Sequence, residues 1–138
     1  MRLLSLQAHN FRQFKGQTPE VVFGAPGDRP ITVFFGTNGS GKTALLNAFT
    51  WTLYGRTSRG FSLPEQVVNN AALKEAERGE MVEAWVEIKF EHLDYRYVVR
   101  RTTRVRRGDT AADISPLGEP VTEMQFAGPD GQWRTEPA

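Results

Sequence analysis

The stretch GTNGSGKT occupies residues 36–43 and matches the pattern G-x-x-x-x-G-K-[ST] at every specified position. In such a loop, glycines let successive backbone N–H groups converge on phosphate oxygens. The preceding residues 31–35, ITVFF, are apolar and rich in β-branched side chains, as in a strand buried on both faces of a sheet. The following residues 41–54 predict a largely buried helix that ends at Gly55. The stretch therefore lies between a strand and a helix, where a phosphate-binding loop is found.

The loop chemistry predicts a nucleoside triphosphate as ligand, ATP first, with Mg²⁺ as its cofactor. Lys42 would reach the β- and γ-phosphates, and the Thr43 hydroxyl would bind the metal ion. The helix that starts near Lys42 adds its N-terminal partial positive charge. The alternative is a glycine-rich turn with a chance lysine, and the complete motif in its strand-to-helix setting argues against it.

Residues 3–11 and 20–23 predict two strands before the loop, because apolar residues recur at every second position or cluster between turn formers. Residues 62–65, SLPE, have the spacing of a capping box with proline in the first turn. They predict a second, more polar helix that runs to Gly79, with a break at Asn69-Asn70.

Residues 81–105 predict a β-hairpin, since apolar and polar residues alternate on both sides of a turn at 91–94. The expected register places Phe90 opposite Tyr95, Ile88 opposite Tyr97 and Val86 opposite Val99. The whole chain is then an α/β domain with four segments: a phosphate-loop core at 1–56, a helical and hairpin region at 57–107, a mobile loop at 108–120 and a terminal hairpin at 121–138.

The composition is that of a water-soluble globular protein, with 39% hydrophobic and 24% charged residues. A formal net charge of +1 gives no global argument for a polyanionic partner. The 138 residues include no cysteine, which excludes disulfides and thiolate metal sites. No stretch has the roughly 20 apolar residues of a membrane span. We expect a cytoplasmic protein without membrane contact.

Several motifs together resemble the N-terminal half of SbcC-type DNA-repair AAA ATPase heads, within the wider SMC/RecF/ABC-type group of P-loop NTPases. NFRQF at 10–14 resembles the family's element after its first strand, and TNGSGKT at 37–43 resembles its Walker A loop. VEIKF at 86–90 and YRYVVRR at 95–101 resemble its hairpin. The helix sequence LLNAFTWTLYG at 45–55 is similar to the neighbouring DndD-type ATPases of DNA sulfur modification and defence.

The resemblance implies an ABC/SMC-type ATPase head, of which this chain supplies the first lobe. It implies a C-terminal lobe of the same head, an ATP-dependent head dimer and DNA as partners, and leaves a nuclease subunit open. It places Arg12 and Gln13 near the nucleotide; without it, Arg12 would be read as a solvated residue after an edge strand. The expected nucleotide-binding residues are Arg12, Gln13, Gly36, Thr37, Asn38, Gly39, Ser40, Gly41, Lys42, Thr43 and Ala44.

The family's signature motif and Walker B acidic pair have no counterpart in this chain, which contains neither an Asp-Glu dipeptide after an apolar run nor a Ser-Gly-Gly. The residue that polarises the attacking water is thus missing, and we expect ATP hydrolysis only after completion by a C-terminal lobe. A fragment, a truncated gene product and one lobe of a split protein all remain open, as does the DNA process served.

Thirteen arginines occur against four lysines, and six of them lie between Arg96 and Arg107. On a strand, four of these project from one face and could contact DNA phosphates: Arg96, Arg100, Arg104 and Arg106. The alternative is a solvated face, with Trp85 stacked on Arg100 and with Glu83 and Glu87 neutralising part of the charge.

Two other functional classes remain. The first is a non-hydrolysing module whose nucleotide stabilises the fold while the arginine face binds DNA or a partner. The second is a P-loop kinase or GTPase, which is disfavoured because the chain lacks the guanine-reading N-K-x-D motif and carries its arginines on an expected strand rather than in a lid.

Overall fold

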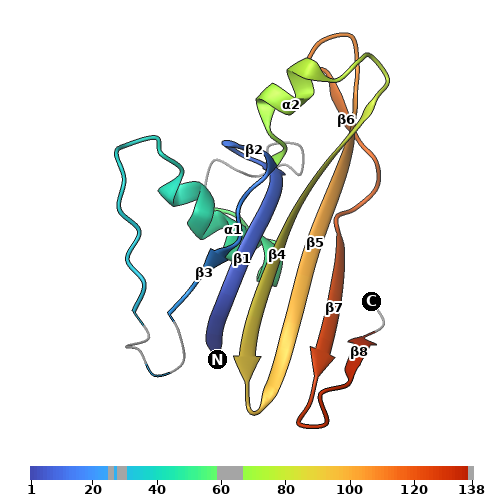
Figure 1. Ribbon diagram of the computed structural model, residues 1–138. Coiled ribbons are helices and arrows are strands. Elements are labelled where there is room, and N and C mark those ends of the chain that lie inside the picture. Colours follow the sequence, from blue (N-terminus) through green and yellow to red (C-terminus); the bar gives the residue numbers. More distant parts are fainter. Residues whose placement is uncertain (25–26, 28–30, 59–66, 137–138) are drawn as a thin grey trace.

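The described residues form one antiparallel sheet and two helices. The computed structural model describes residues 1–24, 27, 31–58 and 67–136. The elements are β1 (Arg2–Phe11), β2 (Phe14–Gln17), β3 (Val21–Val22), α1 (Lys42–Tyr54), α2 (Asn70–Glu75), β4 (Met81–His92), β5 (Tyr95–Arg107), β6 (Ile114–Pro116), β7 (Val121–Ala127) and β8 (Trp133–Glu136). The strand order is β2-β1-β4-β5-β7-β8, with β3 paired to β1 and β6 to β5 (Figure 1). The mixed α/β architecture expected from the sequence is confirmed.

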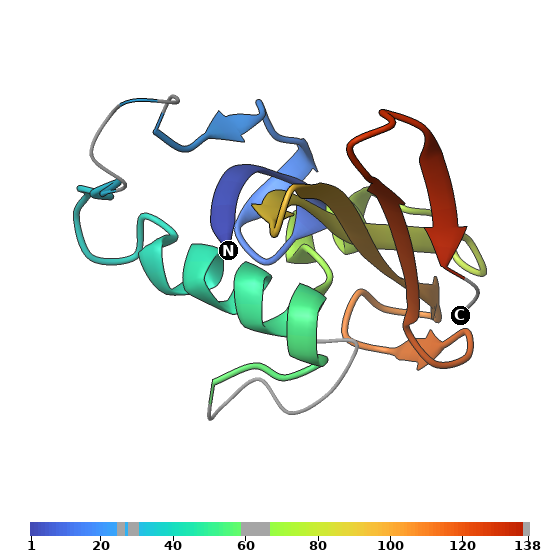
Figure 2. The same ribbon diagram turned by 90° about the horizontal axis from the view of Figure 1, so that it is seen from below.

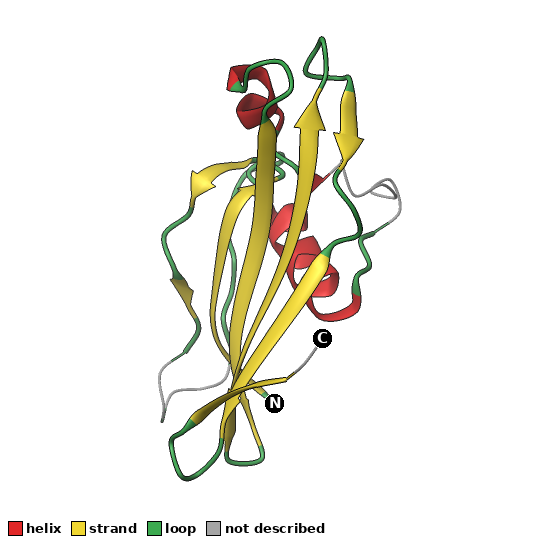
Figure 3. Cartoon of the chain, turned by 90° about the vertical axis from the view of Figure 1, so that its right-hand side faces the viewer, coloured by secondary structure: helices red, strands yellow, loops and turns green. Residues whose placement is uncertain are grey.

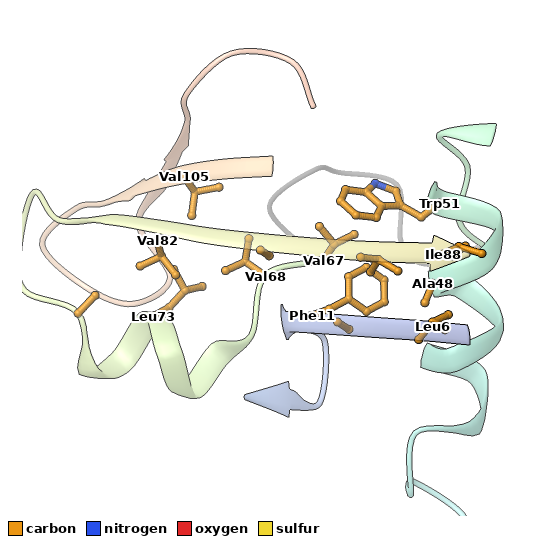
Figure 4. Close-up of a cluster of buried hydrophobic side chains, with 14 of the residues drawn as sticks. Leu6, Phe11, Ala48, Trp51, Val67, Val68, Leu73, Val82, Ile88 and Val105 are labelled. Carbon is orange, nitrogen blue, oxygen red and sulfur yellow. The ribbon is translucent and has the colours of Figure 1, made fainter. Parts of the chain in front are cut away.

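Helix α1 lies along one face of the sheet, and α2 lies near one end of it (Figures 2 and 3). The buried residues of α1 include Ala48 and Trp51. They pack on Leu6 of β1 and Ile88 of β4 in one hydrophobic cluster (Figure 4). The helix ends as predicted at Gly55, whose φ is 67° and whose N–H donates to the Trp51 carbonyl at 2.9 Å. The core thus fixes the helix that carries the phosphate loop.

The β4–β5 hairpin forms, but its predicted register is wrong by two residues. Phe90 lies opposite Tyr97 and Ile88 opposite Val99, because the pairing continues to His92 and Tyr95. Only Leu93 and Asp94 form the turn, both with positive φ, at 49° and 64°. A leucine in the left-handed region is unusual, so the sequence did not indicate a two-residue turn. The shift is even, so each side chain keeps its predicted face.

The buried strand predicted at residues 31–35 is absent. No strand pairs with this segment in the part of the chain that the structure describes, and it lies as extended coil away from the sheet (Figure 1). Ile31 is 72% exposed, Val33 81% and Phe35 103%. Without neighbouring strands on either side, a double-sided apolar strand has neither ladder hydrogen bonds nor a core to enter.

Smaller differences concern element boundaries. The strand predicted at 20–23 is reduced to β3, and β2 was not predicted. The predicted second helix is shorter, since α2 begins after the N-cap Asn69 and ends at Glu75; the capping box at 62–65 lies outside the described residues. The segment 108–120, expected as a loop, contains β6, whereas the terminal hairpin forms as β7 and β8. Among the described helices, none is long and apolar enough to cross a membrane.

Candidate nucleotide-binding site

Residues 36–41 form a tight turn that leads directly into α1. A Cβ at Gly36 would stand 2.5 Å from Ser40 Oγ, so the turn closes on itself and a larger residue at position 36 would require the Ser40 side chain to move. Gly41 has a φ of 101° and caps the helix, a conformation that other residues rarely adopt. The residues of the motif therefore form a narrow loop at the start of α1.

Lys42 folds back over this loop. Its Nζ donates to the carbonyls of Gly36, at 2.5 Å, and Thr37, at 2.7 Å. The first turn of α1 has no acidic residue, and Gly41 offers no side-chain cap. The unpaired N–H groups and the helix dipole at this end therefore act together with the ammonium group, and all three favour an anion.

Thr43 and Ala44 complete the start of α1. Thr43 is exposed, so its hydroxyl is open to a ligand, whereas Ala44 is buried and packs the helix on the sheet. A hydroxyl oxygen is a suitable ligand for Mg²⁺, which keeps several waters and binds substrate phosphates besides one or two protein oxygens. In the described ranges, no group of three or more His, Asp or Glu residues could hold a metal ion. The Thr43 hydroxyl is thus one protein oxygen of the kind that fits a Mg²⁺ site.

Arg12 and Gln13 form the turn after β1, and the described residues of the depression that they line include none from the loop at 36–43. The ring of the next residue, Phe14, lies against Gly41, where an added Cβ would meet it at 3.0 Å. Arg12 is half-buried and has a φ of 53°, and desolvation lowers the pKa of its guanidinium without removing its charge. Gln13 is exposed, and both residues line a depression of about 270 Å³.

The segment that closes this depression was missed by sequence reasoning. Val68 pairs with Phe11 in an isolated β-bridge, and Asn69 N–H donates to the Asn10 carbonyl at 2.7 Å. The sequence carries a signal for this segment. Asparagine before a helical run is a typical N-cap, so Asn69-Asn70 indicates the start of a helix as well as a break in one. The remaining lining residues are Asn70 and Ala71.

The arginine face forms as predicted, on the side of β5 away from α1, but its charges are paired. Arg100 donates to Glu87 through Nε at 3.0 Å and through Nη2 at 2.7 Å. Arg104 pairs with Glu83 at 2.8 Å and Arg96 with Glu91 at 3.1 Å. Arg106 is exposed, and no ion pair is found for it within the described residues.

Trp85 stacks under Arg100, whose Cζ lies 4.3 Å from the ring centroid. The predicted stacking is confirmed, although the contact is diagonal, since Thr102 and not Arg100 lies directly opposite Trp85. The ring of His9 stacks on the same tryptophan with centroids 5.7 Å apart, a contact that the sequence did not indicate. Three of the four arginines of this face are thus paired with glutamates of β4.

A family model described as an AAA domain matches residues 5–127. The chain belongs to this AAA family. The AAA domain is 32% identical over 116 residues to a DNA double-strand break repair Rad50 ATPase from Halobacterium salinarum. That match covers 83% of this chain and 11% of the relative, so the AAA domain spans about a tenth of the relative's length.

The fold of the AAA domain also has a solved counterpart. A structure solved for work on ATP-driven dimerization and DNA-stimulated activation of SMC ATPases superposes with a TM-score of 0.59 over 99% of this chain and 73% of that chain, at 18% identity. The predicted resemblance to SbcC-type, SMC-like ATPase heads is confirmed by these matches. The similarity to DndD-type ATPases stays a prediction.

Proposed function

We propose that this AAA domain binds ATP with Mg²⁺ through residues 36–43 and forms the N-terminal lobe of an ATPase head that acts in DNA double-strand-break repair or DNA processing. One observation carries the proposal: the complete motif lies at the start of α1 with the Lys42 ammonium inside the loop. The name of the Rad50 relative supports the assignment to DNA repair.

The exposed segment 31–35 supports the need for a second lobe. Its apolar side chains and unpaired backbone suit a strand that is completed by neighbours from outside the described residues. In the proposed head, a C-terminal lobe supplies those strands together with the acidic pair and the signature motif. Two heads then close on ATP, as the resemblance implies.

The direct test is a titration of the 138-residue chain with a fluorescent ATP analogue. We expect saturable binding that unlabelled ATP displaces and that weakens strongly when EDTA removes Mg²⁺, because the metal ion neutralises the phosphates that Lys42 and Thr43 face. Absence of displaceable binding in the presence of Mg²⁺ would contradict the proposal.

Hydrolysis by the same chain should be undetectable. The chain has the phosphate loop, but its sequence has no Asp-Glu dipeptide after an apolar run to serve as the Walker B acidic pair, so bound ATP should stay intact over hours in a phosphate-release assay. Adding a C-terminal lobe should produce turnover that depends on Lys42. Retained binding without turnover after this completion would favour a non-hydrolysing module, and turnover by the chain alone would reveal a catalytic carboxylate in it.

DNA contact through Arg96, Arg100, Arg104 and Arg106 is a further part of the proposal, and the ion pairs set its expected strength. Four neutralised phosphates would give a log–log salt slope of roughly −3 to −4 on duplex DNA. Reversal of Arg100 and Arg104 to glutamate should flatten that slope by about two contacts and leave ATP binding unchanged. Because each must first leave Glu87 or Glu83, we expect weak DNA binding by the chain alone. Anisotropy titrations at several salt concentrations measure the slope. Equal slopes for the wild-type chain and the double variant would show that these arginines form a solvated face that does not contact DNA.

A further inference from the structure

Asn69 links α2 to the end of β1 through every polar atom of its side chain. Its Oδ1 accepts from the N–H groups of Ala71 and Ala72, both at 2.9 Å, and so caps α2. Its Nδ2 donates to the Arg12 carbonyl at 2.5 Å. The residue is 5% exposed, so water does not compete for these bonds. A carboxamide of this length is needed because the same side chain must accept at one end and donate at the other.

Arg12 is held in an unfavourable conformation by that contact. Its φ of 53° lies in the left-handed region, where a residue with a Cβ is strained and persists only when its surroundings fix it. Its N–H donates to the Val67 carbonyl at 2.7 Å, and its own carbonyl accepts from Asn69. Both peptide groups that flank the Arg12 Cα are therefore anchored to the segment 67–69.

The anchored turn is followed directly by a contact with the phosphate loop. Two residues after Arg12, the Phe14 ring contacts Gly41 at the start of α1, so the turn that carries Arg12 abuts the loop that carries Lys42. The direction of a side chain follows from the φ and ψ of its own residue. A relaxation of Arg12 out of the left-handed region would therefore swing its guanidinium to a new direction.

We propose that Asn69 is a positioning residue for nucleotide binding, which holds Arg12 in the strained conformation from which its guanidinium binds the nucleotide. The inference rests on the proposed function, together with the family resemblance, which places Arg12 near the nucleotide. It goes beyond that function because Asn69 itself acts through Arg12 and through the backbone.

The test compares the nucleotide affinity and the melting temperature of variants of the 138-residue chain, with a fluorescent ATP analogue and Mg²⁺ as the probe. Asn69→Ser keeps an acceptor for the α2 cap and is too short to reach the Arg12 carbonyl; Asn69→Asp keeps the acceptor and loses the donor. We expect each to raise the Kd about fivefold to tenfold. The control is Lys74→Ala, at an exposed position of α2 outside the depression that Arg12 lines, which should change the Kd less than twofold.

A double-mutant cycle separates positioning from simple stabilisation. In an Arg12→Ala background, Asn69→Ser should lower the melting temperature as before and leave the Kd within about twofold, since no guanidinium remains to be positioned. The inference is overturned if Asn69→Ser lowers the affinity equally in the wild-type and Arg12→Ala backgrounds, or if neither Asn69 variant changes the Kd. Neither result would contradict Mg-ATP binding by the loop. If the Arg12→Ala variant alone binds the nucleotide with wild-type affinity, Arg12 does not contact the nucleotide. The inference is then also wrong, because Asn69 is proposed to act through Arg12.

Discussion

Replacement of Lys42 by alanine should reduce the affinity of the chain for Mg-ATP by about tenfold to a hundredfold. The Nζ group lies against the phosphate loop and donates to the backbone carbonyls of Gly36 and Thr37. A lost charge-assisted hydrogen bond costs about 1.5–3 kcal/mol, and 1.4 kcal/mol corresponds to a tenfold change in Kd. Titration with the fluorescent ATP analogue measures the change.

The same variant should fold normally. Lys42 is exposed and alanine is a good helix former, so the melting temperature should move by no more than about 2–3 °C. Lys74→Ala is the matched control, because Lys74 is an exposed lysine of α2 that lies outside the loop. Equal affinities of Lys42→Ala and Lys74→Ala would show that the loop does not bind the nucleotide.

Replacement of Phe11 by alanine should be the most destabilising single change in the core. Phe11 is fully buried, its ring lies 5.4 Å from that of Trp51 on α1, and its backbone bridges to Val68. Truncation of a buried phenylalanine costs about 3–5 kcal/mol, which is a large part of the 5–15 kcal/mol that stabilises an ordinary domain. We expect the melting temperature to fall by roughly 10–20 °C.

The chain offers an internal control of the same chemistry. Phe35→Ala removes an equal ring from a side chain that is 103% exposed, so the free energy of unfolding should change by less than about 0.5 kcal/mol. Thermal or urea unfolding monitored by circular dichroism measures both variants. Similar losses for Phe11→Ala and Phe35→Ala would contradict the assignment of the core.

The parts of the fold that the sequence predicted well are those with local causes. The loop at 36–43 has a motif, α1 has an apolar composition and a terminal glycine, and β4 and β5 largely alternate between apolar and polar residues. In each case the signal lies within about fifteen residues. That Glu83 and Glu87 neutralise part of the arginine face followed from that alternation, because an even shift preserves the faces; their individual partners, Arg104 and Arg100, depend on the register and were not predicted.

The parts that were missed depend on tertiary partners. The segment 31–35 has the local sequence properties of a strand, but no described strand pairs with it. Local β-propensity alone therefore could not predict whether it forms a strand. The contact between Asn69 and Arg12 joins residues 57 positions apart, and no spacing rule connects them. The Phe14–Gly41 contact is of the same kind.

The exposure of residues 31–35 also bears on how the chain behaves in solution. The sequence ITVFF has no charge and no proline, and high β-propensity, which are the properties of segments that stack between molecules into cross-β assemblies. An unpaired apolar segment of this kind is a template for another chain. A second lobe that pairs with residues 31–35 would therefore also prevent this segment from pairing with other copies of the chain. For the chain on its own, aggregation rather than unfolding then sets the upper limit on working concentration.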